Sequence, residues 1–232
     1  MAILVAIGVA ALAPTTSRAQ DGAATPLAPG DLGVRLSKAV GDGVHYAQGS
    51  GVYLGDGLVL TAAHVVNWDP DHDAVRILLD GIGSDGVLVF DSLLKDTDLA
   101  IVKMRPEALT AARRRQAPVS VCPGNTPPDH PVTVAALGKV SGATTIPAAV
   151  SSMGAQGDWT NILSRDYQPG NSGGGVFDPD KRCLWGIILA ERSGKLPSGL
   201  EVHWTAYAPA SLVGPFVESF IARTPPTTAK TP

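Results

Sequence analysis

The sequence PGNSGGG at residues 169–175 places Ser172 among four glycines. A serine hydroxyl is a weak nucleophile. A serine that attacks a carbonyl group must therefore be exposed on a tight turn, with backbone amides directed at the carbonyl oxygen. Glycines permit that backbone conformation. We interpret Ser172 as a candidate nucleophile, and the amides of Gly170 and Ser172 as a candidate oxyanion hole. A glycine-rich turn without a catalytic role looks the same, so this interpretation needs partner residues elsewhere in the chain.

Two other motifs supply such partners, and both precede Ser172. The sequence TAAH at residues 61–64 ends an apolar run and places His64 beside small alanines, where an imidazole can be held at a cleft. The sequence DTDLAIV at residues 96–102 places Asp98 directly before an apolar strand. A carboxylate buried there can contact the imidazole and fix the histidine tautomer. Asp96 competes for this role, but it lies further from the strand and we expect it to be exposed.

The three motifs TAAH, DLAIV and GNSGG, in the order His, Asp, Ser, resemble those of the trypsin-like serine proteases. The similarity extends from about Val34 to Val217. It implies the chymotrypsin fold, an all-β architecture of two six-stranded antiparallel barrels followed by a C-terminal helix. His64 and Asp98 would come from the first barrel and Ser172 from the second, meeting in the cleft between them. It also implies a serine endopeptidase that works through an acyl-enzyme and needs no metal or other cofactor.

The distribution of apolar runs predicts how the chain is divided. The 26 glycines and 19 prolines favour short strands joined by tight turns. We expect a first barrel over residues 33–110, a linker over 111–118, a second barrel over 119–209, a C-terminal helix over 210–223 and a disordered tail over 224–232. One strand of the second barrel is expected over Ile146–Ser152. The linker contains three consecutive arginines, Arg113 to Arg115, which we interpret as solvent-exposed.

The first residues and the cysteines indicate where the protein works. Residues 1–19 resemble a secretory signal peptide, because a long apolar run is followed by small residues suited to signal peptidase. Residues 20–32 form a lead-in. The apolar run is shorter than the roughly 20 residues that span a bilayer, so we expect no stable membrane association after cleavage. Cys122 and Cys183 fit one disulfide in an oxidising compartment, with two separate buried thiols as the alternative. We expect a secreted or periplasmic bacterial protein.

Charge and motif spacing bear on the remaining partners. A net charge of −3 and a pI near 5.9 do not favour binding to phosphate backbones, so nucleic acid is not expected. Neither cysteine lies in a CxxC motif or beside a histidine at metal-ligand spacing, so no metal site is expected. The expected partner is a protein or peptide substrate. Nothing in the sequence sets the oligomeric state.

The residues around Ser172 also bear on activation and specificity. Animal digestive members of the family carry an aspartate just before the nucleophile that pairs with the new N-terminus, whereas this chain has Asn171. In this it resembles bacterial members such as the Deg-type proteases and the glutamyl endopeptidases. Asp166 occupies the position at which trypsin selects basic side chains, but the sequence DYQPG at residues 166–170 also resembles the glutamyl endopeptidases. The expected pocket wall consists of Leu189, Ala190 and Glu191. A preference for basic side chains, for small or apolar ones, or for acidic ones is compatible with these residues.

Two other functions fit part of the pattern. A catalytically silent binding protein could share the fold, but such proteins usually lose a triad member, and His64, Asp98 and Ser172 are all present. An esterase of the α/β-hydrolase kind shares the pattern Gly-x-Ser-x-Gly of residues 170–174. Its triad has the order Ser, Asp, His, so the histidine-first order of this chain argues against it.

Overall fold

The computed structural model describes residues 28–40, 45–67, 74–92, 97–114, 116–146, 161–164, 167–180, 182–195, 199 and 201–224. The predicted signal peptide, most of the lead-in and the tail beyond Thr224 lie outside these residues. The same holds for Asp96, Arg115 and Asp166.

Six strands form a closed first barrel, in the order β1-β2-β3-β6-β5-β4. They are β1 (Gly33–Val40), β2 (His45–Gly55), β3 (Leu58–Ala62), β4 (Ala74–Leu79), β5 (Ile82–Asp91) and β6 (Leu99–Met104). Neighbouring strands are antiparallel. In β4, Val75, Ile77 and Leu79 are buried while the residues between them are exposed. This alternation is what a strand with one face on the core requires.

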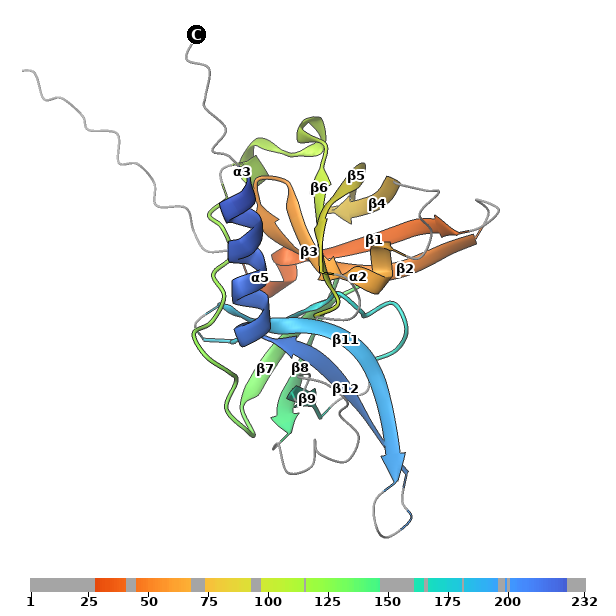
Figure 1. The fold of residues 1–232 in the computed structure, drawn as a ribbon, viewed down its shortest axis with the longest axis vertical. Helices are drawn as coiled ribbons and strands as arrows, with labels where there is room; N and C mark the ends of the chain where they lie inside the picture. Colours follow the sequence, from red (N-terminus) through yellow and green to blue (C-terminus); the bar gives the residue numbers. More distant parts are fainter. Residues whose placement is uncertain are drawn as a thin grey trace, which may run out of the picture.

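A second group of six strands closes in the order β10-β11-β12-β9-β8-β7. They are β7 (Pro131–Ala136), β8 (Lys139–Ile146), β9 (Asn161–Leu163), β10 (Gly175–Phe177), β11 (Leu184–Lys195) and β12 (Glu201–Pro209). The helix α5 (Ala210–Arg223) follows β12 directly, and Figure 1 shows it beside both barrels. The predicted chymotrypsin fold, two six-stranded antiparallel barrels followed by a C-terminal helix, is confirmed.

One strand of the second barrel was not predicted from the sequence. The expectation was Ile146–Ser152, whereas β8 occupies Lys139–Ile146, and residues 147–152 lie outside the described part. The cause is a two-residue turn, Leu137-Gly138, which reverses the chain directly after β7 and pairs Ala136 with Lys139. Such turns favour Asn, Asp or Gly at both positions, so the leucine at the first position weakens the turn signal that Gly138 gives.

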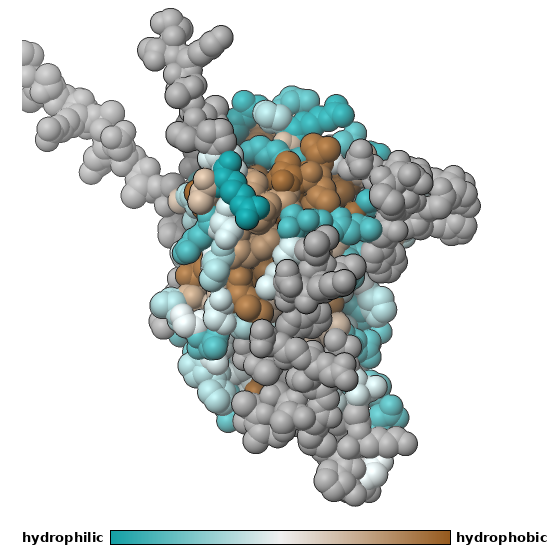
Figure 2. Space-filling model, viewed as in Figure 1, coloured by the Kyte–Doolittle hydropathy of each residue, from teal (hydrophilic) through white to brown (hydrophobic). Residues whose placement is uncertain are grey.

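The helix α5 connects the two barrels on one side of the molecule. The Phe90 ring of β5 lies against Phe216 and Phe220 of the helix, with ring centroids 5.0 and 5.8 Å apart. The Arg223 guanidinium lies 5.2 Å from the centroid of the same Phe90 ring. Figure 2 shows apolar surface along this side of the molecule, beside α5 and over the first barrel. One cluster of buried apolar side chains contains residues of both barrels and of α5, so the barrels share a core.

The linker between the barrels differs from the exposed segment predicted. It contains α3 (Ala111–Arg114), and the Arg113 side chain is only 8% exposed. Arg113 Nε donates to Asp80 Oδ2 at 2.6 Å and Nη2 donates to Oδ1 of the same carboxylate. The guanidinium also lies 5.5 Å from the ring centroid of Tyr53, and burial raises the pKa of this tyrosine. The prediction of solvent exposure is wrong for Arg113, because Asp80 balances its charge and Tyr53 covers its face.

Cys122 and Cys183 form a disulfide, which confirms the pairing favoured from the sequence. Both residues are buried. The bond joins the segment between the barrels to the start of β11, where Cys122 N also donates to Leu184 O at 3.0 Å. Leu184 N donates back to Ser120 O at 2.9 Å. The entry into the second barrel is therefore fixed both covalently and by backbone hydrogen bonds.

The other helices of the described residues are single turns. They are α1 (Pro29–Leu32), α2 (Ala63–Val66) and the 3-10 turn η1 (Pro106–Ala108). α1 lies in the predicted lead-in and places Leu32 in the core. Of the helices in the described ranges, none combines the length and the apolar character needed to cross a membrane.

Candidate active site

Strand pairing brings His64 and Asp98 together. His64 is the second residue of α2, directly after β3, and Asp98 directly precedes β6. β3 and β6 are neighbours in the first barrel, with Ala62 paired to Leu99. The residues that follow Ala62 and precede Leu99 therefore lie at the same end of the barrel, although His64 and Asp98 are 34 positions apart in sequence.

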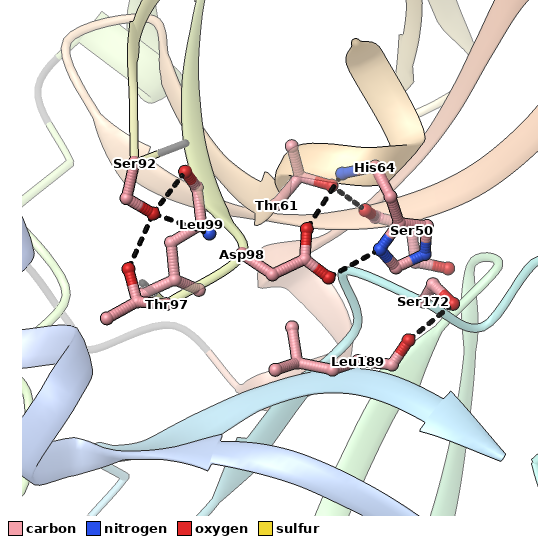
Figure 3. A network of polar contacts seen from close by, with 9 residues as sticks. All are labelled: Ser50, Thr61, His64, Ser92, Thr97, Asp98, Leu99, Ser172 and Leu189. Carbon is pink, nitrogen blue, oxygen red and sulfur yellow. Dashed lines mark hydrogen bonds and ion pairs between the residues drawn. The ribbon is translucent and has the colours of Figure 1, made fainter. Parts of the chain in front are cut away.

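The Asp98 carboxylate contacts His64 at two points. Its Oδ2 lies 2.7 Å from His64 Nδ1, and its Oδ1 accepts a hydrogen bond from His64 N at 2.9 Å. Asp98 is 4% exposed, whereas the His64 side chain is 25% exposed. A carboxylate at Nδ1 places the ring proton there and leaves Nε2 as the acceptor. The imidazole lies between Asp98 and Ser172 (Figure 3).

Neighbouring residues hold Asp98 in place. Its backbone has a positive φ of 51°, a conformation that aspartate adopts more readily than most residues. Its carbonyl accepts a hydrogen bond from Ala63 N at 2.9 Å. Ser92, just after β5, bonds through its hydroxyl to Leu99 N at 3.0 Å and to the Thr97 hydroxyl (Figure 3). Both neighbours of Asp98 in the chain are therefore fixed to the end of β5.

Ser172 lies on the loop before β10 and is held from both barrels. Its carbonyl accepts a hydrogen bond from Ser50 N of β2 at 2.8 Å, and the next amide, Gly173 N, donates to Ile188 O of β11 at 2.7 Å. The Ser172 hydroxyl donates to Leu189 O at 3.1 Å (Figure 3). The side chain is thus ordered beside the imidazole, with its proton directed at β11.

The turn around Ser172 offers two backbone amides. Two neighbouring amides of this turn already have acceptors, since Asn171 N donates to Gln168 O at 3.1 Å and Gly174 N donates to Asn171 O at 2.9 Å. No acceptor within the described residues is bonded to the amide of Gly170 or of Ser172. Gly170 has a φ of 95°, which a residue with a Cβ rarely adopts. Paired amides of this kind can stabilise an oxygen that becomes negatively charged.

A cleft of about 460 Å³ lies in front of these groups and is lined by His64, Gly170 and Ser172. The structure also places the predicted pocket residues Leu189, Ala190 and Glu191 on its wall. Asp166, the other predicted pocket residue, lies outside the described residues. The sequence did not indicate several other lining residues, among them Tyr46, Gln48, Tyr167 and Gln168.

The supporting residues Ser50, Thr61 and Ser92 were also missed. Ser50 stands between two glycines in a strand and Thr61 begins the TAAH motif, so only proximity to a motif could have drawn attention to them. Both are fully buried, and the Thr61 hydroxyl donates to Ser50 O at 2.7 Å. Across the described part of the chain, no three His, Cys, Asp or Glu side chains are grouped so as to hold a metal ion.

Comparisons with known proteins agree with this geometry. A family model described as a trypsin-like peptidase domain matches residues 49–187. No curated protein matches the sequence. Among solved structures, the inactive form of the Rv3671c protease of M. tuberculosis is similar with a TM-score of 0.58 and 15% identity, over 82% of this chain and 89% of that one. The HL collagenase structure is similar with a TM-score of 0.62 and 14% identity, over 86% of this chain and 97% of that one. At such identities the structural likeness concerns the fold.

Proposed function

The chain belongs to the family of trypsin-like peptidases, and on that basis we propose that it is a secreted serine endopeptidase that forms an acyl-enzyme on Ser172. The observation that carries the proposal is the 2.7 Å contact between Asp98 Oδ2 and Nδ1 of the His64 imidazole, on a ring placed beside Ser172. The substrates are proteins or peptides, bound in the cleft that these residues line.

The first half of the proposed reaction transfers the acyl part of the substrate to Ser172. The serine side chain rotates so that its hydroxyl leaves Leu189 O and donates to His64 Nε2. Oγ then attacks the carbonyl carbon while its proton passes to Nε2, and the amides of Gly170 and Ser172 donate to the oxyanion. The carbon–nitrogen bond breaks as the imidazolium gives this proton to the leaving amine. Asp98 stays ionised and stabilises the imidazolium.

The second half releases the acyl group. A water molecule takes the place of the amine and gives a proton to His64 Nε2 as its oxygen attacks the ester carbon. The bond to Ser172 Oγ breaks, and the serine regains its proton from the imidazolium. The product leaves as a carboxylic acid. The enzyme returns to its starting state, so one histidine serves as base and acid in both halves.

Labelling with a fluorophosphonate probe tests this proposal, because an activated serine displaces the fluoride of the probe and becomes phosphonylated. We expect the wild-type protein to be labelled at Ser172, and Ser172→Ala to be unlabelled. Ser164→Ala, which removes an exposed serine, is the control and should be labelled like the wild type. Wild-type protein should also generate new N-termini in a denatured protein mixture. If the wild type is labelled no more than Ser172→Ala, the protein is a catalytically silent binding protein instead.

Export to an oxidising compartment is the second part of the proposal, and the Cys122–Cys183 disulfide supports it because such bonds persist outside the reducing cytosol. If free thiols are alkylated while intact cells are lysed, we expect neither Cys122 nor Cys183 of the protein to be alkylated. We also expect its first residue to be Gln20, after removal of residues 1–19. Full alkylation of Cys122 and Cys183 without added reductant would contradict export.

A further inference from the structure

The turn between β7 and β8 holds a leucine in an unfavourable backbone conformation. Leu137 has a φ of 50° and Gly138 a φ of 70°, and they form a two-residue hairpin loop between Ala136 and Lys139. Two positive φ values in such a loop are typical of a type I′ turn, which favours Asn, Asp or Gly at both positions. A leucine at positive φ is strained, and strain of this kind persists only where surrounding contacts enforce it.

Two side chains of the first barrel hold Leu137 in this conformation. Leu137 N donates to Ser50 Oγ at 2.8 Å, and Leu137 O accepts a hydrogen bond from Arg35 Nη2 at 3.1 Å. Ser50 is fully buried in β2, so its hydroxyl is firmly placed. A strained turn of the second barrel is thus fixed to strands of the first.

The same serine also bonds to the loop that carries the candidate nucleophile. Ser50 Oγ donates to Gly170 O at 2.9 Å, and Ser50 N donates to Ser172 O at 2.8 Å. The Leu137 side chain lies against Gly170, since a Cβ built on this glycine would be 3.4 Å from Leu137 Cδ1. Gly170 therefore has a hydrogen bond from Ser50 and a packing contact from Leu137.

Gly170 needs such support. Because a glycine has no Cβ, its backbone can leave the observed φ of 95° for other conformations at little steric cost. The same loop borders a second hollow of about 370 Å³, lined by Leu137, Gln168 and Asn171 among others. A loop that borders open space has room to move, and a small displacement of an amide weakens its hydrogen bond to an oxyanion.

We propose that Ser50 and Leu137 are positioning residues for the oxyanion hole, which together hold Gly170 by its carbonyl oxygen and its Cα, so that the amide N–H on the other side of that Cα faces the cleft. This inference rests on the proposed serine-protease function. Neither residue contacts the reacting atoms, and both act through Gly170. The strain at Leu137 then has a role, because asparagine would relieve the backbone but would not supply the contact with Gly170.

Leu137→Asn separates positioning from stability. Asparagine suits the turn and keeps the backbone amide that bonds to Ser50, so we expect a melting temperature no lower than that of the wild type. The contact with Gly170 is lost, so we expect kcat to fall about 10- to 100-fold while KM changes less than about two-fold. Steady-state kinetics on a fluorogenic protein substrate and thermal unfolding followed by circular dichroism measure the two effects.

Ser50→Ala tests the hydroxyl, with Thr145→Val as its matched control. The buried Thr145 hydroxyl also joins two backbone groups, since it donates to Pro127 O at 2.7 Å and accepts from His130 N at 2.8 Å. We expect both substitutions to lower the melting temperature by similar amounts. Only Ser50→Ala should lower kcat, again about 10- to 100-fold with little change in KM.

The outcomes separate this inference from the proposed function. If wild-type protein is neither labelled by fluorophosphonate nor active on protein substrates, the proposed function fails and the inference fails with it. If the wild type is active and the two variants keep kcat within about two-fold, the inference alone is overturned. A Leu137→Asn protein that loses thermal stability along with kcat also overturns it, because the leucine would then be structural. If Ser50→Ala does not fold, the kcat and the melting temperature of Leu137→Asn test the inference by themselves.

Discussion

Replacing Asp98 with asparagine is expected to lower kcat by about 10⁴-fold and to leave the fold intact. The asparagine Oδ1 can still accept the hydrogen bond from His64 N, which measures 2.9 Å in the native protein. Its NH₂ group, however, stands where Asp98 Oδ2 accepts the Nδ1 proton. The imidazole then takes the tautomer with its proton on Nε2, and this nitrogen cannot accept the proton of Ser172.

Kinetics on a fluorogenic protein substrate and the rate of fluorophosphonate labelling measure this effect. Asp91→Asn is the matched control, because Asp91 is also a half-buried carboxylate of the first barrel and accepts a hydrogen bond from Asn67 Nδ2 at 2.7 Å. We expect Asp91→Asn to keep kcat within about two-fold. A folded Asp98→Asn protein with kcat within about ten-fold of the wild type would show that Asp98 does not set the tautomer.

The fold and the pairing of His64 with Asp98 could be expected from the sequence for a physical reason. Each residue borders a short apolar run, and such runs become adjacent strands in a barrel. The pairing of Ala62 with Leu99 then brings His64 and Asp98, which are far apart in the sequence, into contact. A histidine and an aspartate are the side chains that such a catalytic pair requires, so their places at the strand ends suffice to predict the pair.

The residues that support the site could not be predicted, because their roles depend on backbone conformation and on long-range contacts. Ser50 lies 87 positions from Leu137 and 120 from Gly170 in the sequence, and its strand alone gives no reason to place it beside either. In the sequence, Leu137 looks like any other apolar residue, and only the structure shows its positive φ. Arg113 belongs to a charged run that predicts exposure, and only the approach of Asp80 explains its burial.

Replacing Gly173 with alanine is expected to prevent the normal contact between the barrels. A Cβ at this position would lie 2.0 Å from Ser50 O and 2.3 Å from Thr61 Oγ1. Ser50 O is backbone of β2 and accepts the Thr61 hydroxyl at 2.7 Å, so it has little freedom to move away. The φ of 87° adds about 1–2 kcal/mol for any residue with a Cβ. We expect unfolding free energy to fall by about 4 kcal/mol or more, which lowers the melting temperature by about 10 °C or more.

A comparison of the thermal unfolding of Gly173→Ala and Gly124→Ala separates the steric clash of the new Cβ from the cost of a positive φ. Gly124 has a similar φ of 72°, but a Cβ built there meets no atom within 4 Å. We expect this control to lose less, about 2–8 °C, because it carries only the backbone penalty. Because Ser50 N also holds Ser172 O across the same contact, any Gly173→Ala protein that folds should react slowly with fluorophosphonate. Equal melting temperatures for the two variants would mean that the second barrel can move away from Ser50 freely. The position of Ser172 would then not depend on close packing between the barrels.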